Sequence, residues 1–443
     1  LPVIGASPMF ADVWAPSRPR RSSFVGFPRM HTPVPQHAAT ARAARRQIVF
    51  INAAHLLTHY SLLILPTAVL AMARPGGPFG PDYGPIVALS TGMFVLYGVG
   101  SLPQGSLAGW FGRKPLMVAF FLGTGAALIA AGMVSTPLLL AAALALAGLF
   151  AAIYHPVGTA MLVEAAGDRP GRSIGVNGVF GNFGVALAPV VTAFLAQQLG
   201  WRLAFVVPGV ICVALGLGWW REPAYDHRAH VVARPFPVIP AALVRRAVVI
   251  LLLIAVVSGL VFNAFTVLLP KLMQERLAGD AHLLPVVGLL AFLVTLCGAL
   301  TQFTVGRLID HTTLKRVFLP LAVVLAPAMV AVSFVSGWPV LVLSAIIAAV
   351  IFGQVTVNET MTARYISPLL RTRMYSVRFF VGFLGSAAAA PLVSFLYERT
   401  GNLTMVTLVL AGFALITLLC ALFFPDRPEE LKPELWPSAT PAE

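Results

Sequence analysis

Long apolar segments recur twelve times along the chain, separated by short polar connections. A helix rises about 1.5 Å per residue, so about 20 apolar residues cross the roughly 30 Å hydrocarbon core of a bilayer. Lipid offers the backbone no hydrogen-bond partners, and a helix satisfies its own backbone within one segment. The segments run over 47–72, 84–108, 115–134, 137–163, 173–199, 203–220, 247–270, 282–305, 317–335, 339–363, 374–397 and 403–424. We therefore expect an all-α membrane protein with twelve transmembrane helices.

The composition favours a lipid-embedded chain and argues against one that binds nucleic acid. Hydrophobic residues make up 58% of the 443 residues, and charged residues only 10%. The mean hydropathy of +0.87 lies above that of soluble domains. The formal net charge is +14, but Lys and Arg stand in the polar connections rather than along one helical face. The lipid bilayer is thus an expected partner, and nucleic acid is not.

Basic residues predict the orientation, because cytoplasmic connections are enriched in Lys and Arg. The connections after even-numbered segments and the connection in the middle of the chain carry most of them. They include Arg113, Lys114, Arg169, Arg172, Arg228, Arg234, Arg245, Arg246, Lys315, Arg316, Arg371 and Arg373. Both termini are therefore expected in the cytoplasm. Residues 1–44 are rich in Pro and Arg and lack an apolar run, so we expect a disordered cytoplasmic tail there.

A repeat relates the two halves of the sequence. At an offset of about 201 residues, many glycines and basic residues fall on residues of the same type. The pairs include Gly105 with Gly306, Leu107 with Leu308, Lys114 with Lys315, Arg172 with Arg373, Gly181 with Gly382, Gly184 with Gly385 and Gly200 with Gly401. We expect two pseudo-symmetric six-helix bundles at 45–221 and 245–425, a cytoplasmic linker at 222–244 and a cytoplasmic tail at 426–443. Parallel repeats place a substrate site between the halves, near the bilayer midplane.

The connection after the second segment carries a recognisable motif. Residues 105–115 read Gly-Ser-Leu-Ala-Gly-Trp-Phe-Gly-Arg-Lys-Pro. This resembles the cytoplasmic loop signature of the major facilitator superfamily, which implies a transporter that works by alternating access. The usual acid of the signature is replaced by Gly109, whereas the repeat keeps its acid at Asp310.

The same signature implies a charged gate at the cytoplasmic end. The candidates are Arg113, Lys114, Arg172, Asp310 and Arg373. We expect Asp310 to pair with Arg172 across the halves only while that end is closed. Such a pair stabilises the closed state over the open state by the difference in its interaction energy between them, typically about 1–3 kcal/mol. The alternative is that both are solvated surface charges, because exposed pairs contribute little.

Three further motifs narrow the resemblance. They are Ala-His-Leu-Leu-Thr-His over 54–59 with Leu-Pro at 65–66, Tyr-His-Pro over 154–156, and Gly-Val-Phe-Gly-Asn-Phe-Gly over 178–184. These are similar to the fosmidomycin-resistance type of facilitator, although His59 stands where the related pattern tends to carry an acid. The resemblance implies proton-driven export of a drug or metabolite. We expect a monomer in the bacterial cytoplasmic membrane, a small-molecule substrate, protons as the coupling ion and no cofactor.

Histidines within the apolar segments are candidates for proton coupling. His55 and His59 are four residues apart and share a helical face. His55 and His155 each lie roughly 14 Å from the nearest charged residue at the cytoplasmic end, hence at similar depth. Imidazole titrates across the range that a proton gradient spans, so His55, His59 and His155 are candidates. Two alternatives are neutral histidines bonded between helices, and a metal site, which the lack of a nearby acid or thiol disfavours.

Other polar residues within the segments are candidates for the substrate cavity, because each is costly in hydrocarbon unless it has a partner. They are Tyr154, Asn177, Asn263, Gln354, Glu359 and Arg378. Glu359 and Arg378 are expected to pair, since an unpaired buried charge costs so much. The neutral residues contact either substrate or a neighbouring helix.

Three functional classes fit the sequence, and a fourth does not. Export in exchange for protons is the first prediction, and proton-coupled import of an organic acid or metabolite shares every architectural feature. A membrane sensor is a third class, although no signalling domain is attached. An enzyme is not expected, because the sequence offers no nucleophile with its base, no phosphate loop and no metal-ligand set.

Overall fold

The computed structural model describes residues 35–166, 170–223, 239–278, 284–366 and 368–432. Every regular element in these ranges is helical. Residues 43–443 form one compact unit, and the bundle described below lies within it.

The first half of the chain contributes six spans, three of which join two helices. Its elements are α1 (Pro35–Leu62), α2 (Ile64–Met72), α3 (Tyr83–Ala88), α4 (Thr91–Gly100), α5 (Gln104–Phe111), α6 (Arg113–Met133), α7 (Pro137–Ala151), the π-helical turn η3 (Tyr154–Gly158), α8 (Thr159–Ala166), α9 (Pro170–Leu199) and α10 (Trp201–Arg221). Proline explains the break between α1 and α2. Pro66 has no N–H, so the carbonyl of Leu62 loses its helical partner and the first span bends at Leu63.

The second half contributes the other six spans. Its elements are α11 (Ala241–Met273), the π-helical turn η4 (Gln274–Ala278), α12 (Leu284–Ile309), α13 (Leu314–Phe334), α14 (Trp338–Tyr365), α15 (Pro368–Ala387), α16 (Ala389–Thr400), α17 (Thr404–Phe423) and the short 3₁₀ turn η6 (Pro428–Glu430). The break between α15 and α16 falls at Ala388, three residues before Pro391. Proline again removes one helical hydrogen bond there.

Twelve helices or helix pairs among the described residues are long and apolar enough to cross a membrane, which confirms the predicted all-α fold of twelve spans. Three boundaries differ from the sequence prediction. The second span ends at Gly100, and α5 is a separate short helix after Pro103. Residues 35–44 are helical rather than part of a disordered tail, because five of these ten residues are alanine, the strongest helix former. The helix α11 begins at Ala241, inside the expected linker.

Glycines from the predicted repeat have matching structural roles. A Cβ atom on Gly184 would lie 2.2 Å from the carbonyl oxygen of Leu56, and one on Gly385 would lie 2.1 Å from that of Val256. Only glycine therefore permits α9 to pack on α1, and α15 on α11, at this distance. The two helix pairs occupy corresponding places in the two halves.

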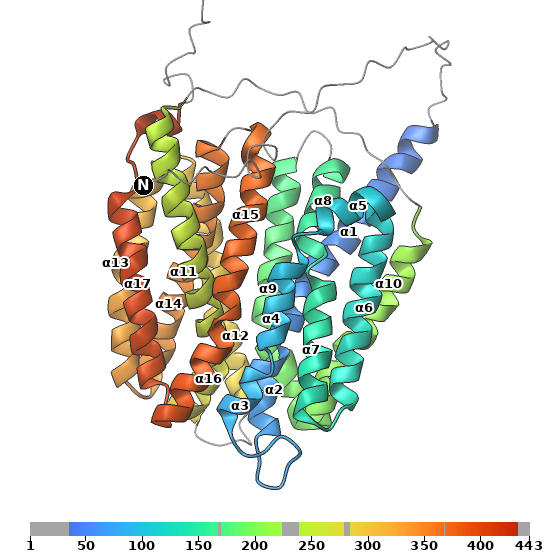
Figure 1. Ribbon diagram of the computed structural model, residues 1–443, viewed down its shortest axis with the longest axis vertical. Coiled ribbons are helices and arrows are strands. Elements are labelled where there is room, and N and C mark those ends of the chain that lie inside the picture. Colours follow the sequence, from blue (N-terminus) through green and yellow to red (C-terminus); the bar gives the residue numbers. More distant parts are fainter. Residues whose placement is uncertain (1–34, 167–169, 224–238, 279–283, 367, 433–443) are drawn as a thin grey trace, which may run out of the picture. The chain divides into compact units, whose positions relative to one another are not determined.

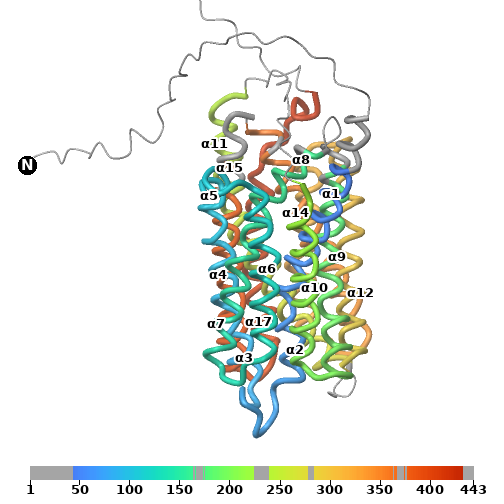
Figure 2. Tube along the Cα trace, turned by 90° about the vertical axis from the view of Figure 1, so that its right-hand side faces the viewer, coloured from blue at the N-terminus to red at the C-terminus, as the bar shows by residue number. Residues whose placement is uncertain are grey.

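The two halves lie side by side, and their helices run in roughly the same direction. Figure 1 shows the helices of the first half, in blue and green, beside those of the second half, in yellow to red. Figure 2 shows that the helices run roughly parallel to one axis. The halves meet where α9 packs on α12, α4 on α15 and α3 on α16. The site described next lies along this junction.

A short segment after α17 is anchored beside the neighbouring helix ends. Glu430 of η6 is buried and accepts hydrogen bonds from the backbone N–H of Leu314 and from the hydroxyl of Tyr365, the latter at 2.8 Å. Arg364 lies 3.5 Å from the same carboxylate. Burial raises the pKa of Glu430 above its usual value, even though these partners favour the charged form. Residues 426–432 of the expected tail thus include an anchored turn.

Candidate functional site

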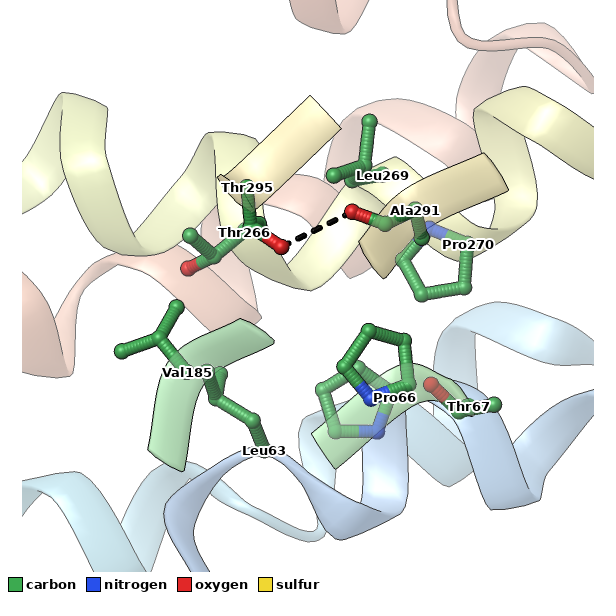
Figure 3. A pocket seen from close by; sticks show the side chains of 10 residues that line it. Leu63, Pro66, Thr67, Val185, Thr266, Leu269, Pro270, Ala291 and Thr295 are labelled. Carbon is green, nitrogen blue, oxygen red and sulfur yellow. Dashed lines mark hydrogen bonds between the residues drawn. The ribbon is translucent and has the colours of Figure 1, made fainter. Parts of the chain in front are cut away.

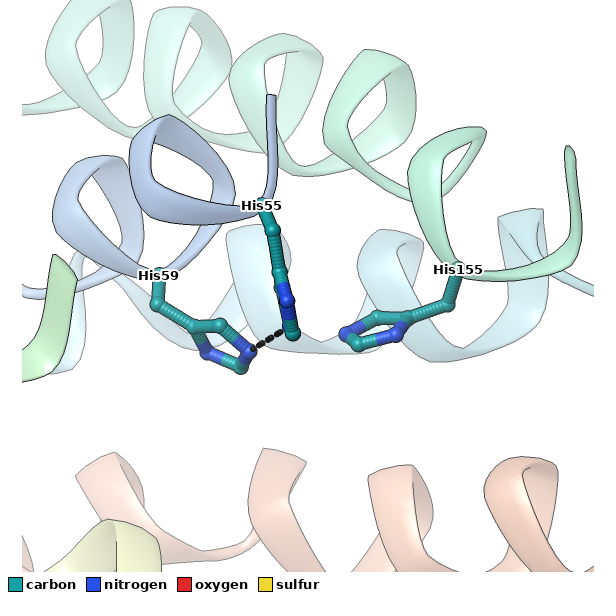
Figure 4. Close-up of side chains that lie close together, drawn as sticks. All are labelled: His55, His59 and His155. Carbon is teal, nitrogen blue, oxygen red and sulfur yellow. Dashed lines mark hydrogen bonds between the residues drawn. The ribbon is translucent and has the colours of Figure 1, made fainter. Parts of the chain in front are cut away.

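Three histidines from two spans meet near the junction of the halves. His55 and His59 come from α1, and His155 comes from the π-helical turn η3. Their ring centroids are 5.0 to 5.4 Å apart, and Figure 4 shows the three imidazoles pointing toward one another. The sequence placed His55 and His155 at similar depth and His59 on the same helical face as His55, and the structure brings all three together. Their predicted role in proton coupling stays a prediction.

A hydrogen bond fixes the orientation of the central imidazole. Nδ1 of His55 lies 2.7 Å from the backbone carbonyl oxygen of Asn177, in α9. A carbonyl oxygen only accepts, so Nδ1 of His55 carries the hydrogen. In the neutral ring Nε2 then carries a lone pair, and it lies 3.2 Å from Nε2 of His59.

The side chain of Asn177 is held in place on both sides. Its Oδ1 accepts a hydrogen bond of 2.9 Å from the hydroxyl of Tyr154, and its Nδ2 donates one of 2.9 Å to Oδ1 of Asn52. Tyr154 also stacks on His55, with ring centroids 4.8 Å apart. Asn52 was not predicted, although it lies one turn before His55 on the same helical face. Together these residues form a polar network around the histidines.

The histidine cluster also contacts the second half of the chain. His155 stacks on Phe379 of α15, with ring centroids 5.7 Å apart, and lies 6.3 Å from Phe383. Tyr97 of α4 is 4.6 Å from the Phe383 ring. Sequence reasoning missed these aromatic residues because phenylalanine in an apolar segment carries no distinguishing signal. A relative movement of the halves would change the surroundings of His155.

Glu359 of α14 and Arg378 of α15 form the ion pair that the sequence predicts. The Arg378 side chain is 10% exposed and that of Glu359 is 40% exposed. Arg378 also lies 5.0 Å from the ring of Phe379, the residue on which His155 stacks. A charged pair therefore lies next to the histidine cluster, within the second half.

The remaining cavity candidates lie apart from the histidines. Nδ2 of Asn263 donates a hydrogen bond of 2.7 Å to the hydroxyl of Ser386 and one of 3.0 Å to the carbonyl of Gly259. It thus joins α11 to α15, which is the helix-bonding alternative. Gln354 is buried, and its Nε2 has no hydrogen-bond partner among the described residues. Contact of either residue with substrate stays a prediction.

A small cavity lies between the halves, beyond His59 along the first span. Figure 3 shows its lining, which includes side chains from α2 and α9 of the first half and from α11 and α12 of the second. It has room for about one water molecule. The lining residues are Leu63, Pro66, Thr67, Val185, Pro189, Thr266, Leu269, Pro270, Ala291 and Thr295. The threonines give this largely apolar cavity hydrogen-bonding groups.

Beyond the cavity, the halves close against each other at the α3–α16 end. The rings of Tyr83 and Tyr397 lie 5.2 Å apart, and the Tyr83 hydroxyl donates a hydrogen bond of 3.4 Å to the carbonyl of Val267. Nζ of Lys271 is 5.6 Å from the Tyr83 ring and 3.5 Å from Glu275, which accepts a hydrogen bond from Tyr397. Sequence reasoning missed this group, because nothing in the pattern relates a connection of the first half to one of the second.

The predicted cytoplasmic gate is described only in part. Asp310 is exposed at the end of α12, and none of the described side chains forms an ion pair with it. The side chains of Arg172 and Arg373 lie outside the described residues. Arg113 and Lys114 begin α6, where the Lys114 carbonyl accepts a hydrogen bond of 3.3 Å from Trp219. The pairing of Asp310 with Arg172 stays a prediction.

Twelve spans in two joined halves, with a polar cluster at the junction, define a polytopic membrane protein. The sequence model of the Major Facilitator Superfamily matches residues 51–284 and 280–441, which is most of the chain. The chain belongs to this superfamily, whose fold is that of transporters of small molecules.

Solved structures of the same fold cover nearly the whole chain. A bacterial homologue of the human lysosomal transporter Spinster, inward-facing and occupied, has a TM-score of 0.66 at 12% identity and covers 85% of this chain and 95% of that one. A D-xylose-proton symporter has a TM-score of 0.69 at 13% identity and covers 86% of this chain and 98% of that one. At such identities the likeness shows the fold alone.

One curated relative matches part of the sequence. A probable hexose phosphate transport protein from Chlamydia pneumoniae is 28% identical over 139 residues. The match spans 31% of this chain and 30% of the relative. The chain is therefore similar to less than a third of that protein.

Proposed function

We propose that the protein is a secondary active transporter of the bacterial cytoplasmic membrane that exports a small molecule in exchange for protons. The observation that carries the proposal is the polar cluster at the junction of the halves, where His155 contacts Phe379 of the other half. A solute bound there touches both halves, so a movement of one half against the other can expose it first to one face and then to the other. Alternating access requires a site of this kind.

Two features support a site that opens to one face at a time. The halves are closed at the α3–α16 end by Tyr83 and its partners. The small cavity lies between this closure and the histidine cluster. Positive charge in the even-numbered connections supports placing the α3–α16 end outside the cytoplasm, with both termini inside.

Export is supported by the resemblance of the motifs at 54–59, 154–156 and 178–184 to the fosmidomycin-resistance type.

A second candidate is uptake of an anionic solute together with protons. Arg378 favours it, because this cation lies beside the cluster at the junction. The relative named as a probable hexose phosphate transport protein favours it too. A guanidinium is well suited to bind phosphate or carboxylate groups. The two candidates share their architecture and differ in whether the solute moves against the protons or together with them.

Inverted membrane vesicles separate the two candidates. With no pH gradient imposed, each compound of a panel is added outside, at the former cytoplasmic face, and the luminal pH is followed with a dye. Antiport carries protons out and makes the lumen more alkaline, whereas symport carries protons in and acidifies it. Vesicles without the protein are the control, and a protonophore must abolish either signal. If the luminal pH stayed unchanged with every compound while the protein was folded, this result would contradict proton coupling and favour a sensor.

A further inference from the structure

We propose that His55, His59 and His155 form a binding site for a divalent transition-metal ion of the kind that prefers imidazole, such as Zn²⁺. Each residue offers one ring nitrogen, and the three nitrogens all lie within 4.8 Å of one another. The inference concerns this site alone, and it holds whichever way the solute moves.

The spacing within the first span fits chelation. Two histidines four residues apart on a helix can bind one ion from the same face. Zinc–nitrogen bonds of about 2.0–2.1 Å in a tetrahedral site place two ligand nitrogens about 3.3 Å apart. Nε2 of His55 and Nε2 of His59 are 3.2 Å apart. The two nitrogens therefore need little movement to share an ion, once the hydrogen that His59 Nε2 donates to His55 Nε2 has moved to Nδ1 of the His59 ring.

The hydrogen bonding around His55 also suits a ligand. Histidines that bind metals usually donate their other ring N–H to a carbonyl or carboxylate, which fixes the ring and raises its basicity. Nδ1 of His55 donates in this way to the backbone carbonyl of Asn177. Tyr154 and Asn52 hold Asn177 in turn. The lone pair of His55 Nε2 is thus directed toward His59 before any ion arrives.

The third ligand comes from an unusual helical turn. His155 belongs to the π-helical turn Tyr154–Gly158, and such turns are frequent at functional sites. Its ring centroid lies 5.2 Å from that of His55 and 5.4 Å from that of His59. A rotation of the His155 side chain that brings one ring nitrogen closer to the other two would complete three ligands. Three protein ligands leave a fourth position for water or a donor atom of a solute.

The charges around the cluster indicate an exchangeable ion. Imidazole suits Zn²⁺, Ni²⁺ and Cu²⁺, but three neutral rings leave the charge of the ion uncompensated. Arg378 faces His155 and opposes binding, while its ion pair with Glu359 offsets part of that repulsion. The group contains no thiolate or carboxylate ligand. We therefore expect affinity well below that of a structural zinc site.

The test uses purified, untagged full-length protein in detergent, since a histidine tag binds the same ions. After treatment with a chelator, Co²⁺ is added and its visible absorption is recorded, because tetrahedral Co²⁺ absorbs much more strongly than octahedral. Zn²⁺ is then titrated by calorimetry and by its effect on the unfolding temperature. We expect one tetrahedral Co²⁺ per chain, displaced by Zn²⁺, and a higher unfolding temperature with Zn²⁺.

Variants tie the signal to the cluster. His59→Leu and His155→Leu should weaken binding at least about tenfold, whereas His59→Asp should retain it, because a carboxylate is also a zinc ligand. The matched control is His311→Ala, an exposed histidine outside the spans. The proposal fails if folded wild-type protein shows neither the tetrahedral spectrum nor zinc stabilisation, or if His311→Ala weakens binding as much as His59→Leu. Loss of proton-driven transport in His59→Leu, with no ion bound by the wild type, would instead support the proton role.

Discussion

Tyr83 of α3 and Tyr397 of α16 meet edge to face across the two halves, with ring centroids 5.2 Å apart. The neighbouring position, Gly84, leaves no room for a side chain, because a Cβ atom there would lie 2.9 Å from the carboxylate of Glu398. These contacts join the halves at the end that we place outside the cytoplasm. Any state open at this end must break them.

Replacing Gly84 by leucine should therefore favour the open state. A cysteine in place of Thr67, which lines the cavity below, should react several-fold faster with a water-soluble maleimide when Gly84→Leu is also present. The three native cysteines are first replaced. Gly412→Leu is the control, since no atom lies within 4 Å of its Cβ position. Equal labelling rates in the two backgrounds would show that the contact does not hold this end closed.

The close approach of α9 to α1 leads to a prediction on stability. Gly184→Ala would place Cβ 2.2 Å from the Leu56 carbonyl oxygen, so the helices must separate and the unfolding temperature should fall by several degrees or folding should fail. Gly178→Ala, on the same helix with open space at Cβ, should be neutral or stabilising by up to about 1 kcal/mol. Thermal unfolding in detergent measures both. Similar melting of the two variants would contradict the packing argument.

The ion pair between Glu359 and Arg378 predicts a non-additive pair of substitutions. Arg378→Met leaves the Glu359 charge without this partner and should lower the unfolding temperature by about 2–5 °C, whereas adding Glu359→Leu should recover part of the loss. The recovery is partial, because Glu359 is 40% exposed and water already screens its charge. A double variant no more stable than Arg378→Met would mean that the two charges are not coupled.

The buried carboxyl group of Glu430 predicts a pH dependence. Its pKa is raised in the folded protein, so its contribution to stability is present below the ordinary value of about 4.3 and is lost as pH rises through the raised value. Glu430→Gln, which has no charge to bury, should gain stability relative to wild type as the pH rises above about 4.3. Unfolding temperatures across this range measure the difference. A Glu430→Gln variant that is no more stable than wild type at any of these pH values would contradict the prediction.

Residue patterns predicted the spans well and the tertiary contacts only in part. Apolar length alone gives the twelve spans, because each must cross the same thickness of lipid. The free-energy cost of an unpaired buried charge predicted that Glu359 and Arg378, on neighbouring spans, form a pair. Depth along the helices placed His55 and His155 at one level, but their mutual rotation depends on the π-helical turn, which no periodicity reveals.

The contacts between the halves lay beyond sequence reasoning. Phe379 is an ordinary residue for an apolar segment, and Tyr83 is an ordinary residue for the end of a span. Only the docking of the two bundles makes Phe379 a neighbour of His155, and Tyr83 a neighbour of Tyr397. The orienting bond from His55 goes to a backbone carbonyl, a group that every residue has. A side-chain pattern cannot select such an acceptor.

The π-helical turn at Tyr154–Gly158 has a consequence for movement within the fourth span. It contains one residue more than a regular turn, and each residue of an α-helix corresponds to about 100° of rotation. The stretch before it, α7, packs on α4 and α6, whereas α8 after it packs on α9. The packed face of α8 is thus rotated about the helix axis relative to that of α7. If the extra residue migrated along the span by one turn, the His155 ring would swing away from α1 while both ends of the span stayed anchored.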